Sequence, residues 1–146
     1  MPTNLPAERT VLGALIEDAD LFSDAISEGL TVDDFSISAH RRIFGAILEL
    51  REKNCPVDYI AVAEQIGNAP EDFALIGDLI SGVVIERTHI LHHVRIVRKK
   101  SRLRALMKLA DWISHSAVQV AADPDALVQV TLTKLEAIDN CVGVLG

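Results

Sequence analysis

The segment from about Thr88 to Ala121 contains no proline or glycine, and this absence constrains the fold more than any other feature. Proline breaks a helix and glycine weakens it, so apolar residues at helical spacing in such a segment predict one long continuous helix. The second half of the segment carries apolar residues at spacings of three and four, which is a heptad pattern. These residues are Leu103, Leu106, Ala110, Ile113, Ala117 and Val120.

A second helix with a matching pattern is predicted after Asp123-Pro124, a turn followed by a helix start. The same spacing returns in Val128, Thr131, Leu135, Ile138 and Val142. Two consecutive helices with matching apolar seams and a tight connection predict an αα-hairpin. A hairpin that projects from a head leaves one apolar side in water, and such patches usually mark an interface. We therefore expect an oligomer interface, formed by Leu103, Leu106, Ala110, Ile113, Ala117, Val120, Val128, Leu135 and Ile138.

Short helices are predicted before the long one. Val11, Leu12, Leu15 and Ile16 share one helix face, and Ile43, Phe44 and Ile47 share another. The expected caps and starts are Ser36 or Ser38, Asp58 and Pro70, and the expected stops are Gly29 and Gly67. The sequence therefore predicts an all-α fold: a compact helical head over residues 1–88, a helical hairpin over 89–142 and a tail over 143–146.

Composition narrows the class of protein. Of 146 residues, 49% are hydrophobic, which is enough for a packed core, and the net charge of -7 argues against nucleic-acid binding by the whole surface. No apolar run is long enough for a membrane span, and the N-terminus does not resemble a signal peptide. Cys55 and Cys141 are too few for a disulfide framework. A cytoplasmic location is expected.

No motif for chemistry is present. The chain lacks GxxxxGK[ST] and GxGxxG, so we expect neither an ATP site nor any other cofactor, and no enzyme activity of its own. His89 and His93 would share a helix face as zinc ligands can, but HILHH lacks the glutamate of HExxH, and surface histidines are the preferred interpretation. His40 is expected to be a packed or hydrogen-bonded structural residue. Nothing supports a Cys-His dyad through Cys55. Catalytic and metal sites are therefore both expected to be absent.

The strongest charge feature is a basic stripe in the long helix, with no acidic residue between Glu86 and Asp111. Three interpretations stay open. The stripe binds nucleic-acid phosphates, or it meets an acidic surface on another subunit or partner, or it is a solvated face. Its residues are Arg95, Arg98, Lys99, Lys100, Arg102, Arg104 and Lys108.

Five motifs in order, NLPAERTVLGALIED, DDF, AHRRIFGAIL, PVD and HVRIVRKKSRLRAL, resemble the N-terminal domain of DnaB-type replicative helicases from about Asn4 to Asn140. The resemblance implies a collar on a ring-shaped motor, in which hairpins of neighbouring subunits pair and the collar docks primase and loading factors. ATP and Mg²⁺ would then belong to the parent helicase's motor. The segment EDFALIGDLISGVVIERTH departs from the family pattern, and His93 replaces its aromatic.

The predicted function is therefore an interaction and oligomerisation domain of DNA replication, at least dimeric and without a motor in this chain. The alternative is a small helical nucleic-acid-binding or regulatory protein that uses the basic stripe at residues 95–108. An excised domain and a stand-alone relative both fit the sequence.

Overall fold

The computed structural model describes residues 1–67, 70–80 and 87–143, without the side chains of residues 73, 80, 87, 88 and 140–143. The predictions for Cys141, Val142 and the end of the tail lie outside the described side chains. All regular elements of the described ranges are helical, so the predicted all-α fold class is confirmed. In chain order they are α1 (Leu5–Glu17), α2 (Ala19–Ser27), η1 (Val32–Asp34), α3 (Ser38–Glu52), α4 (Tyr59–Ile66), α5 (Pro70–Ile80), α6 (Arg87–Ala117) and α7 (Pro124–Gly143).

Most helix boundaries follow local chemistry. The Asp58 carboxylate accepts a hydrogen bond from the Ala61 amide at 2.7 Å and caps α4. Gly67, with φ of 105°, ends that helix in the left-handed conformation that glycine adopts without strain. Pro70 and Pro124 begin α5 and α7 as predicted.

Two boundary predictions are wrong. Neither Ser36 nor Ser38 caps α3: the N-cap is Ile37, no side chain caps it, and the Ser36 hydroxyl bonds to Glu8 instead. The long helix ends at Ala117 rather than Ala121, and turns follow it. The β-branched residues Val118 and Val120 at this point have low helix propensity. Val120 consequently lies in the connection between the hairpin helices.

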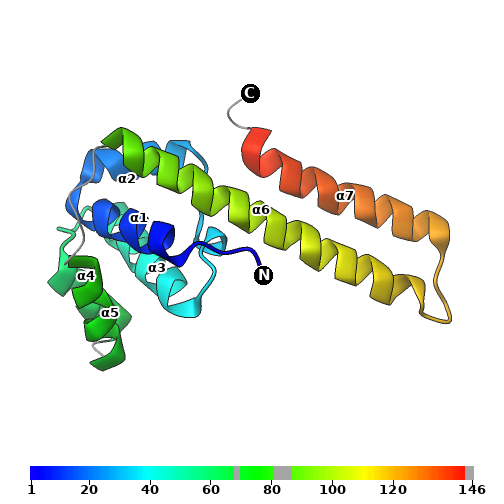
Figure 1. The fold of residues 1–146 in the computed structure, drawn as a ribbon, viewed down its shortest axis with the longest axis horizontal. Helices are drawn as coiled ribbons and strands as arrows, with labels where there is room; N and C mark the ends of the chain where they lie inside the picture. The colour runs from blue at the N-terminus through cyan, green and yellow to red at the C-terminus, as the bar shows by residue number, and fades with distance from the viewer. Residues whose placement is uncertain (68–69, 81–86, 144–146) are drawn as a thin grey trace.

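The head is built around three stacked elements, α1, α3 and the first part of α6 (Figure 1). Phe44 of α3 lies at its centre, with ring centroids 5.1 Å from Phe35 and 6.5 Å from Phe22. The first part of α6 completes this core through side chains that are fully buried: Ile90, Val94 and Val97. The head thus takes in the beginning of the long helix, although the sequence-based division placed residues 89–142 in the hairpin.

The rest of α6 extends beyond the head, and α7 returns beside it as the second arm of the hairpin (Figure 1). Leu109 is the one buried apolar side chain among the described residues beyond Val97. The hairpin is therefore a pair of helices that projects from the head and has very little core of its own.

Candidate interaction surface on the helical hairpin

The apolar seam of the hairpin is largely open to solvent. Of the predicted interface residues, Ile113 and Ile138 are half-buried between the two helices. The others are exposed: Leu103, Leu106, Ala110, Ala117, Val120, Val128 and Leu135. Sequence reasoning missed further exposed apolar residues, namely Val118, Val130 and Leu132, whereas Met107, which it placed near the edge of the interface, is 45% exposed. The spacing of three between Leu132 and Leu135 was the available signal for one of them.

A groove of about 380 Å³ runs between α6 and α7. Four apolar side chains form most of its lining, and Arg102, Glu136 and Asp139 stand around it with both signs of charge. The apolar four are Leu106, Leu132, Leu135 and Ile138. Trp112 lies on the same hairpin, where the Lys134 ammonium is 4.9 Å from the centre of its ring. An apolar groove with charged edges has the composition of a protein interface.

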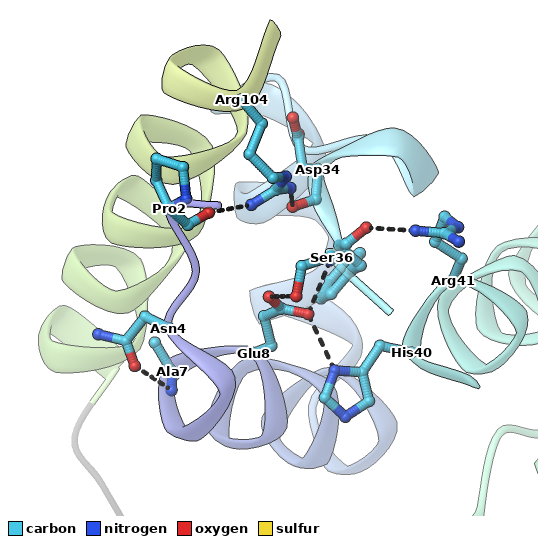
Figure 2. A network of polar contacts seen from close by, with 10 residues as sticks. Pro2, Asn4, Ala7, Glu8, Asp34, Ser36, His40, Arg41 and Arg104 are labelled. Carbon is cyan, nitrogen blue, oxygen red and sulfur yellow. Dashed lines mark hydrogen bonds and ion pairs between the residues drawn. The ribbon is translucent and has the colours of Figure 1, made fainter. Parts of the chain in front are cut away.

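Much of the predicted basic stripe is bound to the head. Arg95 forms a bidentate ion pair with the Glu28 carboxylate, with hydrogen bonds of 2.8 and 3.2 Å. These hydrogen bonds lower the pKa of the Glu28 carboxyl. Arg98 donates to the Glu28 backbone carbonyl and lies 3.7 Å from the Asp34 carboxylate. Arg104 donates to two backbone carbonyls, those of Pro2 and Asp34 (Figure 2). These arginines anchor α6 on the head.

Gly29 explains how Arg98 fits. Its φ of 91° is left-handed, and a Cβ built there would lie 3.0 Å from the Arg98 guanidinium carbon. Gly29 therefore ends α2, as predicted, and also leaves room for the arginine. Of the remaining stripe residues, Lys99 and Lys108 are exposed, and Lys100 and Arg102 are half-buried.

A buried polar network joins α1 to the start of α3 (Figure 2). The Glu8 carboxylate accepts from the Ser36 hydroxyl at 2.6 Å and the Ser36 amide at 3.0 Å, and it lies 2.9 Å from His40 Nδ1. Burial raises the pKa of Glu8, but the bonds from His40 and Ser36 outweigh burial, so the pKa lies below its ordinary value. His40 is fully buried, and the prediction of a structural hydrogen-bonded histidine is confirmed.

The remaining candidates for chemistry stay dispersed. Burial, followed by the neighbouring His92 and His89, lowers the pKa of His93. Within the described residues, no three His, Cys, Asp or Glu side chains gather as metal ligands would. Cys55 is exposed and unpaired. No described helix is both long and apolar enough to cross a membrane.

Together, a helical head and a long projecting hairpin define the class, an all-α head-and-hairpin domain. The family model for the DnaB-like helicase N-terminal domain matches residues 1–99. The chain belongs to this family. A crystal structure of the N-terminal domain of DnaB helicase from Mycobacterium tuberculosis is similar, with a TM-score of 0.76 and 26% identity, covering 93% of this chain and 98% of that one.

Two curated relatives agree with this family. The chain is 31% identical over 144 residues to the replicative DNA helicase DnaB of Geobacillus stearothermophilus, covering 95% of this chain and 31% of the relative. It is 34% identical over 118 residues to the replicative DNA helicase DnaC of Bacillus subtilis, covering 78% of this chain and 26% of the relative. The chain thus spans about a third of the length of these helicases or less.

Proposed function

We propose that this domain is the collar of a replicative DNA helicase, and that it pairs with a second copy through the hairpin. The observation that carries the proposal is the exposed apolar seam on both hairpin helices, next to a head whose own core is complete. A second hairpin packed on this seam would remove it from water, and a two-fold arrangement is the commonest way for one surface to cover itself.

We also propose that the collar docks a primase or a helicase loader. Membership of the DnaB-like helicase N-terminal domain family supports this docking, whereas the groove between α6 and α7 belongs to the surface proposed for pairing. ATP and Mg²⁺ would act in a motor domain, and this domain by itself would hydrolyse no ATP. A cytoplasmic location follows from a role in DNA replication.

Light scattering at micromolar concentration tests the pairing. Leu106 is 42% exposed and Leu132 is 49% exposed, and both line the groove, so the double variant Leu106→Glu with Leu132→Glu places two charges in the proposed interface. We expect a dimer for the parent chain and a monomer for this variant, because unpaired buried charges are costly. Ile60→Glu is the control, since Ile60 is 80% exposed on the head. A parent chain that is monomeric with its helices intact by circular dichroism contradicts the proposal.

The second candidate function is nucleic-acid binding through the basic stripe. The exposed lysines Lys99 and Lys108 favour it, while the engagement of Arg95 and Arg104 with the head reduces the charge available. A salt titration of binding to single- and double-stranded DNA separates the two functions. Phosphate binding by the stripe requires log affinity to fall linearly with log salt concentration, and an unmeasurable affinity at low salt excludes it.

A further inference from the structure

A second cavity lies where the hairpin leaves the head, apart from the apolar groove. Its volume is about 480 Å³, and η1, α3 and α6 contribute its lining. Four of the lining residues, spaced as one face of α6, are Ser101, Arg104, Ala105 and Lys108. Arg41 of α3 and Asp33 of η1 complete it. The lining thus carries three cationic side chains, one hydroxyl and one carboxylate.

Backbone carbonyls hold the two arginines of this cavity. Arg104 donates to the carbonyls of Pro2 and Asp34 at 2.9 and 2.8 Å, and Arg41 donates to the carbonyl of Phe35 at 3.0 Å. The two guanidinium groups therefore donate to consecutive peptide carbonyls, those of Asp34 and Phe35. Figure 2 shows Arg104 and Arg41 approaching these carbonyls from α6 and α3. Neutral carbonyls fix the position of a guanidinium group without cancelling its charge.

By contrast, carboxylates pair closely with two other arginines. Arg42 bonds to Asp72 at 2.8 Å, and Arg95 bonds to Glu28. Arg104 bonds to the backbone carbonyl of Asp34, while the carboxylate of Asp34 accepts from the Thr31 amide and lies near Arg98. Asp33 is consequently the one carboxylate among the residues that line the cavity.

Arg104 makes the excess charge significant, because it is only 8% exposed. A buried cation is costly unless an anion or a dense set of hydrogen bonds compensates it. Two guanidinium groups, an ammonium group and a hydroxyl converging on one space are the groups that proteins use for phosphate. The volume falls in the range of small-molecule sites, about 300–1,000 Å³, which leaves room for the group that a phosphate is attached to.

We propose that this cavity binds a phosphate dianion, as carried by a small phosphate ester or by the terminal phosphate of a nucleic acid. Arg104 and Arg41 supply fixed positive charge, Lys108 reaches the phosphate from the exposed turn of α6, and Ser101 donates from its hydroxyl. The site is separate from the hairpin seam, so its occupancy does not depend on the proposed pairing.

Inorganic phosphate is the first probe, added to the full chain at constant ionic strength while backbone amide resonances are recorded. We expect saturable shifts confined to residues around the cavity. Lys108→Gln should weaken binding at least about fivefold, the equivalent of two unit charges about 4 Å apart in water, because a dianion interacts more strongly than a single charge. Lys99→Gln is the matched control, because it removes the same charge from an exposed position of the same helix. Asp33→Asn should strengthen binding about threefold to fivefold, a gain that damage to the fold would not produce.

Several outcomes overturn the proposal: shifts that sodium chloride reproduces, shifts elsewhere on the molecule, equal affinity of the Lys108→Gln and Lys99→Gln variants, or shifts with a glutamate-rich peptide but not with phosphate.

Two further arms identify the source of the phosphate. A small ester such as ribose 5-phosphate is compared with a short oligothymidylate, the latter with and without a 5′-phosphate. Tighter binding of either phosphorylated probe than of inorganic phosphate supports the site and names its source. Equal binding of the two oligonucleotides overturns the terminal-phosphate form.

Discussion

The head buries most of its large apolar side chains, whereas the hairpin leaves most of its large apolar side chains exposed. In the head, aliphatic and aromatic side chains from α1, α3 and α6 are fully buried, and even the buried carboxylate of Glu8 has partners. In the hairpin, Leu109 is buried while Leu103, Leu106 and Leu132 face water. The comparison teaches that a regular heptad pattern alone does not indicate whether its partner lies within the chain or outside it.

The largest effect should come from the centre of the head. Phe44→Ala removes a ring packed between Phe22 and Phe35, and we expect a loss of about 3–5 kcal/mol in the free energy of unfolding. Domains of this size have about 5–15 kcal/mol in total, so the variant is at risk of unfolding. Leu15→Ala should cost about 2–5 kcal/mol. Urea unfolding measures both, with the exposed Ile60→Ala as control. A Phe44→Ala chain as stable as the control would refute this description of the core.

A smaller and more informative effect is expected in the hairpin. Leu109→Ala should cost about 2 kcal/mol or slightly more, the lower end for a buried leucine, because Leu109 lies outside the core cluster of the head. Leu132→Ala, the same deletion at an exposed position of the partner helix, should change the stability of the monomer by less than about 0.5 kcal/mol. Chemical unfolding at low concentration measures this difference. If pairing occurs, the stability cost of Leu132→Ala grows with protein concentration. Equal costs for the two variants at low concentration would contradict the described difference in burial between Leu109 and Leu132.

The smallest expected effect is on the stability of the fold at acid pH. Because the pKa of Glu8 in the folded chain lies below its ordinary value of 4.5, its ionised form stabilises the fold. This contribution is fully present above pH 4.5 and is lost as the pH falls through the lower, folded-state pKa. Melting temperatures between pH 7 and pH 3 should therefore fall less steeply for Glu8→Gln than for the parent chain. Glu52→Gln, an exposed substitution at the end of α3, should keep the parent's slope. If the melting temperature of Glu8→Gln falls with pH as steeply as that of the parent chain, Glu8 does not cause the loss of stability in acid.

The sequence predicted those parts of the fold that depend on near neighbours. Asp58, Gly67, Pro70 and Pro124 act within a few residues of their own position, and each boundary was found from the sequence. Ser36 misled the cap prediction because its hydroxyl serves Glu8, 28 residues earlier in the chain.

Contacts between residues far apart in the sequence were likewise missed on the interaction surface. The basic stripe was visible from composition, but the carbonyl partners of Arg104 lie 102 and 70 residues away, so its anchoring role was not. Leu109 lies outside the heptad positions that were followed, and for that reason its burial was missed. Most of the predicted seam residues are exposed, and their role as an oligomer interface stays a prediction.

The unbroken course of α6 has a mechanical consequence. Its 31 residues correspond to a rod about 46 Å long, with one end embedded in the head and the other at the tip of the hairpin. With Arg95, Arg98 and Arg104 clamping the embedded part, the rod has no described break at which to bend independently of the head. A tilt of the head by about 10° would swing the far tip by about 8 Å. Small displacements at one end of this lever arrive enlarged at the other.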